Sequence, residues 1–184
     1  MVSSSQKRKR PDKFEHFLNR AMVAAEMSTC LRRRIGAIIV KDGVEVSSGY
    51  VGSPRGTKHC IDTGKCLRKE LGIPPGERYE LCRSVHAEQN AIINASRMGV
   101  SIVGGEMYLH SERNKGQYNE KSGETRKMYG PCMICTKMII NAGLVAVHMK
   151  EEGVGTETYT VDDLKQTLRE QEESLKRSFK KPKG

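Results

Sequence analysis

The sequence predicts an α/β protein with three layers, in which helices cover both faces of a mixed central sheet. Segments with apolar residues at helical spacing alternate with short β-rich runs along most of the chain, an order typical of this fold class. With 184 residues, 36% of them apolar, the chain is long enough for a single hydrophobic core. We therefore expect one folded domain over residues 13–175, between a disordered basic tail at 1–12 and a basic tail at 176–184.

The first predicted elements are a helix and a β-hairpin. Apolar residues recur at helical spacing from residue 14 to about residue 27, which indicates an amphipathic helix. The runs Ile35–Lys41 and Val44–Gly49 are β-rich and flank Asp42-Gly43, the strongest short hairpin signal. We expect these two strands to pair antiparallel.

Helices and strands alternate through the second half of the chain. Helices are expected over His86–Met98 and Cys132–Ala142, each followed by glycine, and a charged helix is expected from Val161 to about Arg177. Strands are expected at Glu106–His110 and Leu144–Met149. Because crossover helices connect them, these later strands are predicted to be parallel.

Two long segments lack regular periodicity. Residues 51–85 contain eight glycines and prolines, and a loop of that length inside a compact domain requires something that pins it. The polar segment Glu112–Gly130 is interpreted either as a lid or specificity loop, or as a surface insertion without a role in function.

The charge distribution argues against a nucleic-acid partner. The formal net charge is +10, but residues 1–13 carry +4 of it and residues 176–184 carry +5. The body of the chain is close to neutral and contains no tryptophan. A basic surface with interleaved aromatic residues is therefore not expected.

Hydropathy and cysteine content indicate the compartment. No apolar run approaches the roughly 20 residues of a membrane helix, and no apolar stretch follows the charged N-terminus as it would in a secretory signal. We therefore expect a protein of the cytosol or the nucleus, with the cytoplasm as the favoured location and no membrane partner. Because thiols stay reduced in that compartment, the six cysteines favour metal binding or catalysis over disulfides.

Two motifs lie at the starts of two predicted helices. The first is the H-x-E sequence that begins at His86, and the second is the P-C-x-x-C sequence Pro131–Cys135. Zinc-dependent base deaminases have this signature in this order, with one His and two Cys on Zn²⁺ and a Glu that moves protons. Cys132 and Cys135 lie within one helical turn, so both sulfurs can face one tetrahedral metal ion, and the helix N-terminus favours their thiolate forms.

These motifs predict a catalytic zinc ion held by His86, Cys132 and Cys135, with Glu88 as the general acid and base. Three protein ligands leave a fourth position for water, which loses a proton near neutral pH and can add to the amidine carbon of an aminopyrimidine. Glu88 can take the proton of this water, protonate the ring nitrogen and deliver a proton to the departing amine. The alternative is a structural zinc or redox pair, but a closed structural site needs no adjacent base.

Around these motifs the chain resembles the cytidine and deoxycytidylate deaminase superfamily, and within it the deoxycytidylate (dCMP) deaminases, including the late competence proteins of that type. The similar stretches cover most of residues 14–150 and lie at 28–41, 49–54, 59–60, 81–92 and 131–143. The resemblance implies a cytidine-deaminase-like three-layer fold, a homo-oligomer, a nucleotide as substrate, and zinc-dependent conversion of dCMP to dUMP and ammonia.

The resemblance also implies a substrate site. It assigns the 5′-phosphate contact to Arg32 and places Val51 and Ala87 among the substrate-binding residues. Family members carry Asn where this chain has Val51, and valine offers no hydrogen bond to a sugar or base. We expect weaker discrimination at the sugar, or another aminopyrimidine nucleotide as substrate, unless a neighbouring residue compensates.

Four further cysteines lie outside the zinc motif: Cys30, Cys60, Cys66 and Cys82. A second, closed zinc site built from them would pin the 51–85 segment, with His59 as a substitute for one thiol. The resemblance favours this interpretation, because some dCMP deaminases have an additional zinc in the matching region. The alternative is four buried thiols that pack as small apolar side chains.

The sequence leaves two alternatives to a nucleotide deaminase. A deaminase of tRNA or of single-stranded nucleic acid could be recruited by the basic tails, but such an enzyme needs basic residues beside the zinc motifs rather than at the termini. A zinc scaffold without activity would be expected to lack the proton-moving carboxylate, whereas Glu88 is present.

Overall fold

The computed structural model describes residues 10–74, 77–114 and 130–180. Its centre is a five-stranded sheet in the order β2-β1-β3-β4-β5. The strands are β1 (Arg33–Lys41), β2 (Val44–Tyr50), β3 (Glu106–Arg113), β4 (Ala146–Glu151) and β5 (Gly155–Thr160). Strand β1 is antiparallel to both β2 and β3, β3 and β4 are parallel, and β5 is antiparallel to β4. The strands joined by crossover helices therefore run in one direction, as predicted.

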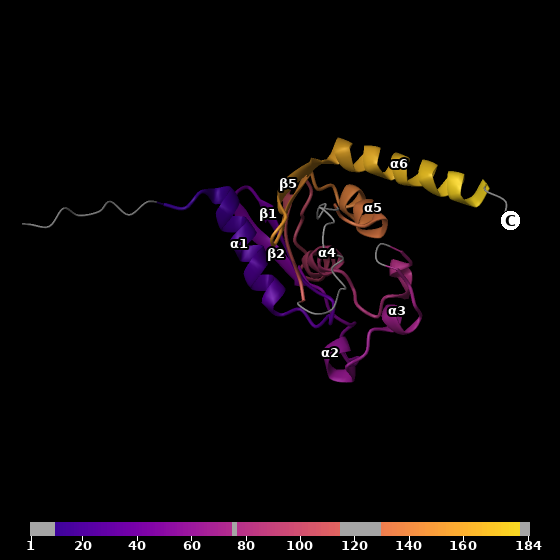
Figure 1. The fold of residues 1–184 in the computed structure, drawn as a ribbon. Coiled ribbons are helices and arrows are strands. Elements are labelled where there is room, and N and C mark those ends of the chain that lie inside the picture. The colour runs from indigo at the N-terminus through magenta and orange to yellow at the C-terminus, as the bar shows by residue number, and fades with distance from the viewer. Residues whose placement is uncertain (1–9, 75–76, 115–129, 181–184) are drawn as a thin grey trace, which may run out of the picture.

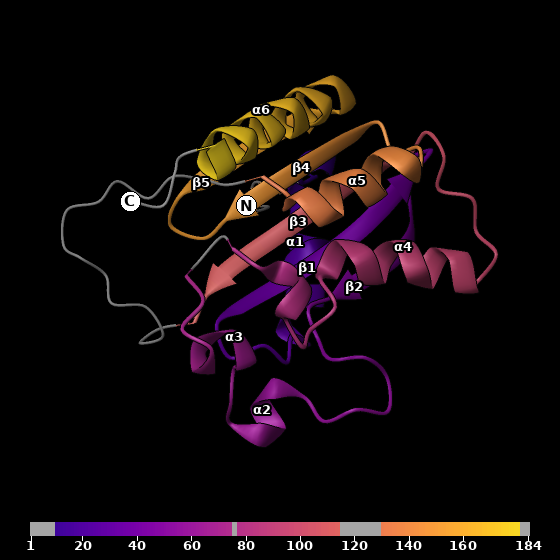
Figure 2. The ribbon, with the colours of Figure 1, turned by 90° about the vertical axis from the view of Figure 1, so that its right-hand side faces the viewer.

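Helices cover both faces of this sheet. Helix α1 (Lys13–Glu26) lies on one face, and α4 (Ala87–Arg97) and α5 (Met133–Asn141) lie on the other (Figure 1). Helix α6 (Val161–Lys180) packs beside α5 and leads to the C-terminus (Figure 2). The predicted three-layer sandwich with a mixed sheet is confirmed. Among the residues that the structure describes, no helix combines the length and apolar character that a membrane crossing requires.

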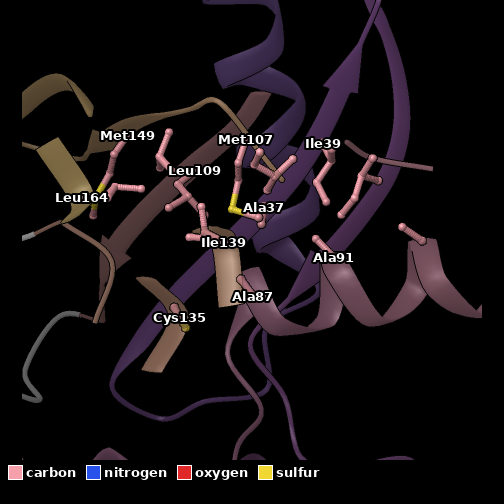
Figure 3. Close-up of a cluster of buried hydrophobic side chains, with 14 residues drawn as sticks. Ala37, Ile39, Ala87, Ala91, Met107, Leu109, Cys135, Ile139, Met149 and Leu164 are labelled. Carbon is pink, nitrogen blue, oxygen red and sulfur yellow. The ribbon is translucent and has the colours of Figure 1, made fainter. Parts of the chain in front are cut away.

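Alternating residues of β1 supply the two halves of the core. Ala37 and Ile39 belong to the cluster under α4 and α5, together with Met107 and Leu109 of β3 (Figure 3). Ile38 and Val40 point to the opposite face of the sheet and belong to a second cluster, under α1. This alternation follows from the two-residue repeat of a strand, and it explains why β1 has no charged or polar side chain between Ile35 and Val40.

Two glycines bring helices close to the sheet. A Cβ atom on Gly36 would lie 2.2 Å from the carbonyl oxygen of Ala21 in α1. A Cβ atom on Gly49 of β2 would lie 2.3 Å from the backbone nitrogen of Ala91 and 2.6 Å from the carbonyl oxygen of Ala87. Glycine at position 49 therefore sets the position of the first turns of α4 against the sheet.

The predicted hairpin turn is also confirmed. Asp42 and Gly43 have φ angles of 52° and 76°, the left-handed pair that a two-residue hairpin requires. Strand β2 follows directly and pairs with β1.

The structure differs from the sequence prediction in two places. Strand β5 was not predicted, because it is an exposed edge strand whose side chains are nearly all polar and lack apolar alternation. The 51–85 segment contains short helical turns, namely α2 (Cys60–Thr63), α3 (Leu67–Glu70) and the 3₁₀ turn η1 (Tyr79–Leu81). Within the predicted Glu112–Gly130 segment, residues 115–129 lie outside the described residues, and β3 extends to Arg113.

Candidate active site

Two helix N-termini bring three metal-binding side chains together. His86 is the N-cap of α4, and Cys132 is the N-cap of α5. The start of α4 is stabilised by Gln89, whose side-chain oxygen accepts a hydrogen bond from the His86 backbone N–H at 2.8 Å. Cys135 follows in the first turn of α5 and is completely buried against the core that Figure 3 shows. Both helices thus begin at the same place on one face of the sheet.

The three donor atoms of His86, Cys132 and Cys135 lie within 4.8 Å of one another. His86 Nδ1 is 3.4 Å from the Sγ atom of each cysteine. One imidazole nitrogen and two sulfurs that converge in this way form a donor set that suits tetrahedral zinc with one position open. The residues therefore fit a zinc ion of the catalytic kind.

The electrostatics of the cluster favour charged donors. A hydrogen bond from Cys135 and contact with His86 lower the pKa of the Cys132 thiol. Burial opposes protonation of His86, but contacts with Cys132 and Cys82 outweigh burial and raise its pKa to about 10. Without a metal ion, a thiolate thus faces a cationic imidazole. A metal ion that binds here would displace the imidazole proton and be coordinated by the thiolate and by the neutral imidazole.

Glu88 lies in the first turn of α4, two residues after His86. Its side chain is 7% exposed. Burial raises the pKa of the Glu88 carboxyl, while the charge of His86 opposes that shift. The carboxyl group also contacts Cys135. A buried carboxylic acid beside an open metal position has the placement and the raised pKa that a general acid and base requires.

Sequence comparison agrees with this site. The model of the cytidine and deoxycytidylate deaminase zinc-binding region matches residues 11–151, a span that contains all four side chains. The chain belongs to this deaminase family. The same span contains the whole of the sheet except β5.

Relatives in the family include nucleotide deaminases. The ComE operon protein 2 of Bacillus subtilis is 33% identical over 138 residues, which is 75% of this chain and 59% of the relative. A deoxycytidylate deaminase of Mycobacterium phage D29 is 31% identical over 148 residues, which is 78% of this chain and 98% of the relative. The chain spans only 37% of the deoxycytidylate deaminase of Schizosaccharomyces pombe, at 29% identity.

A solved structure of a deaminase has the same fold. The dCMP deaminase of cyanophage S-TIM5, in complex with dCMP and dUMP, superposes with a TM-score of 0.56 at 26% identity. The match covers 89% of this chain and 94% of the phage protein. The predicted cytidine-deaminase-like fold is therefore confirmed.

The deaminase-family positions predicted to bind substrate lie beside the zinc cluster or just before β1. Val51 is 5% exposed, its N–H donates to the Ile35 carbonyl, and the next residue, Gly52, exchanges two backbone hydrogen bonds with Val85. Val85 directly precedes His86. Ala87 is fully buried at the start of α4. Arg32 is half-buried, immediately before β1.

Cys30, Cys66 and Cys82 lie around Cys60, but these four described cysteines do not form a second compact cluster. Cys60 lies near enough to the other three thiols for their charges to interact, and burial raises its pKa. Within the described residues, however, only His86, Cys132 and Cys135 bring three metal-binding atoms within 4.8 Å. Cys82 hydrogen-bonds His86 instead, and His59 contacts the Thr29 hydroxyl at 3.1 Å.

Sequence reasoning missed two side chains beside the site. The Tyr79 ring meets the His86 ring edge to face, with centroids 5.3 Å apart. The Arg68 guanidinium lies 4.5 Å from the Tyr79 centroid and donates to the carbonyls of Pro74 and Glu77. Arg68 lies in α3 and Tyr79 in η1, and turns of three or four residues are too short for hydrophobic periodicity to reveal them.

Proposed function

We propose that this protein is a zinc-dependent hydrolytic deaminase of a cytosine nucleotide, and that it converts dCMP to dUMP and ammonia. The observation that carries the proposal is a buried carboxyl group, Glu88, next to a His/Cys/Cys donor set that fits zinc. The names of the relatives and the dCMP- and dUMP-bound phage structure support this choice of substrate.

His86, Cys132 and Cys135 would hold the zinc ion. When bound, a zinc ion with three protein ligands supplies Lewis acidity to water in its remaining position. Glu88 would accept a proton from the attacking water and donate it to the ring nitrogen. Glu88 would then carry the second water proton to the exocyclic amine, so that the C–N bond breaks and ammonia leaves.

The substrate-binding roles belong to the same proposal. Arg32 would bind the 5′-phosphate as a cation with several N–H donors. The fully buried Ala87 would contribute through its backbone, since its methyl group is enclosed by protein. Val51 would leave one polar group of the sugar or base without its usual partner, which favours relaxed discrimination or another aminopyrimidine nucleotide.

A second, structural zinc ion is proposed for Cys30, Cys60, Cys66 and Cys82. The proximity of Cys60 to the other three thiols supports it. Fully loaded protein should then contain two zinc ions per chain, and Cys82→Ser should lower the melting temperature more than kcat. A single zinc ion per chain in active, fully loaded protein would contradict this part of the proposal.

The proposed setting is a homo-oligomer in the cytoplasm, without a membrane or nucleic-acid partner. Six free cysteines suit a reducing compartment. Apolar side chains that remain exposed on α4 and α5, such as Ile93 and Ile134, support association of chains.

Ammonia release from a panel of substrates tests the function. The panel contains dCMP, CMP, dCTP, deoxycytidine, a cytosine-containing single-stranded oligonucleotide and tRNA. We expect turnover of a cytosine 5′-monophosphate. Turnover of the oligonucleotide or tRNA alone would instead favour a nucleic-acid deaminase.

A further inference from the structure

We propose that Asn114 is a positioning residue that holds the Arg32 loop, defined as residues 28–32, and thereby sets the affinity for the 5′-phosphate of the substrate. The inference rests on the proposed function, because it takes a nucleotide as the substrate and Arg32 as its phosphate contact. Asn114 would act through protein backbone, since it donates hydrogen bonds to carbonyl groups of this loop.

Asn114 hydrogen-bonds three consecutive carbonyl groups of this loop. Its side-chain Nδ2 donates to the carbonyl oxygens of Cys30 at 3.1 Å and Leu31 at 2.9 Å. Its backbone N–H donates to the carbonyl oxygen of Arg32 at 3.1 Å. These groups are more than 80 residues apart in the sequence, so the bonds fasten the loop to the end of β3 rather than to its own neighbours.

The chemistry of the side chain suits this role. An asparagine amide nitrogen carries two N–H donors and can serve two adjacent carbonyls at once. Aspartate has the same shape but presents only acceptor oxygens when ionised, which the carbonyls would repel. Asn114 is half-buried, so lost hydrogen bonds would be only partly replaced by water.

Asn114 is itself held by the sheet. Arg33 of β1 pairs with Arg113 of β3 at the end of their ladder, and Asn114 is the next residue after this last pair. Glu151 of β4 is almost completely buried and accepts hydrogen bonds from Arg33 at 2.7 Å and Arg113 at 3.1 Å. The ends of three strands are thus tied together directly beside the bond between Asn114 and Arg32.

The other end of the Arg32 loop is connected to the zinc cluster. The Thr29 N–H donates to the Val51 carbonyl at 3.0 Å, and Gly52 pairs with Val85, the residue before His86. The loop therefore spans the distance between the end of β3 and the start of α4. A shift at its Asn114 end would move Arg32 relative to the reacting end of the site, and small errors in substrate position reduce binding and rate.

The test compares dCMP with deoxycytidine as substrates of wild-type, Asn114→Ala and Asn114→Asp protein. We expect Asn114→Ala to raise KM for dCMP about tenfold, while kcat/KM for deoxycytidine changes less than about twofold. Asn114→Asp should raise KM for dCMP at least as much. Asn114→Gln, which keeps the amide, should restore part of the affinity.

Asn94→Ala is the matched control. Its amide nitrogen also donates to a backbone carbonyl, that of Ser48 at 2.8 Å, but it lies away from the Arg32 loop. This variant should leave the preference for dCMP unchanged. Melting temperatures verify that each variant is folded.

In Asn114→Ala, an equal loss on dCMP and deoxycytidine overturns the inference, and so does an unchanged KM for dCMP. Failure of the proposed function is visible separately, as absence of ammonia release from dCMP by wild-type protein. Calorimetric dissociation constants of dCMP and deoxycytidine then provide the same comparison between wild-type and variant protein. A wild-type protein that binds the two equally also overturns the inference, because no phosphate contact would exist to be positioned.

Discussion

The three side chains of the proposed zinc site differ in how deeply they are buried. Cys135 is completely buried in the core, whereas Cys132 and His86 are half-buried at helix N-caps. Replacement of Cys135 therefore changes packing as well as the donor set, and Cys132 is the cleaner position for a test of metal binding.

Cys132→Ser is expected to leave the His86/Cys132/Cys135 site mostly without zinc, because serine replaces one of its three proposed ligands and supplies no thiolate. Zinc content by mass spectrometry of the purified protein checks this. Met133→Ala, which changes the next residue of α5 without removing a ligand, should keep its zinc. Full zinc occupancy of the cluster in Cys132→Ser would show that this thiol is not a ligand.

Val51→Asn is expected to increase the preference for dCMP over CMP, because an amide at this position could hydrogen-bond the substrate. The ratio of kcat/KM values for the two nucleotides is the measurement. If the wild-type protein already prefers dCMP by a wide margin and the substitution leaves the ratio unchanged, position 51 does not contribute to discrimination.

The residues of the candidate site could be predicted from sequence only where a local motif identifies them. His86 and Glu88 are two residues apart, and the two cysteines share one helical turn, so each motif can be recognised without knowledge of the fold. Tyr79 and Asn114 belong to no such motif. Their roles depend on contacts with His86 and with the Arg32 loop that only the folded chain creates.

At the scale of secondary structure elements, the contact between β2 and α4 determines where the zinc cluster is built. Gly49→Ala would place a Cβ atom 2.3 Å from the Ala91 backbone nitrogen, so α4 must move away from the sheet. We expect a loss of roughly 1–3 kcal/mol in the free energy of unfolding, together with lower kcat. Urea denaturation measures the first effect and ammonia release the second.

Ser48→Ala is the control for this prediction. Ser48 is the preceding residue of β2, and its side chain is exposed. It should be close to wild type in stability and activity. Unchanged stability and activity of Gly49→Ala would mean that the first turns of α4 tolerate displacement from the sheet.

The buried histidine of β3, His110, should make stability depend on pH. Burial lowers the pKa of His110, against the opposing charges of Glu152 and Glu112, while Lys150 lowers it further. The unfolded chain then binds more protons than the folded protein once the pH falls below the ordinary histidine value of about 6.5. Stability is therefore expected to decrease as the pH drops through that value.

The measurement is urea denaturation of wild-type and His110→Leu protein at pH 7.5 and pH 5.5. The difference between the two pH values should be smaller in His110→Leu, by at most about 1.4 kcal/mol per pH unit for one group. Burial also lowers the pKa of His148, against the opposing charge of Glu106. Part of the pH dependence of stability should therefore remain in His110→Leu. An identical pH dependence in both proteins would contradict the assignment to His110.

At the scale of the whole molecule, the layers and the strand directions could be predicted because they follow from hydrophobic periodicity and crossover connections. The edge strand β5 could not, because its exposed residues lack apolar alternation. The short turns of the 51–85 segment could not either, because four-residue helices carry too little periodicity to be distinguished from a loop.

The central claim is that one buried carboxyl group moves the protons of a zinc-dependent deamination. The most direct measurement is ammonia release from dCMP by Glu88→Gln protein that is shown to carry as much zinc as the wild type. Because glutamine keeps the shape but cannot accept and return a proton, we expect turnover to fall by at least about a hundredfold with unchanged zinc content and melting temperature. Turnover within about tenfold of wild type, at full zinc content, would contradict the claim.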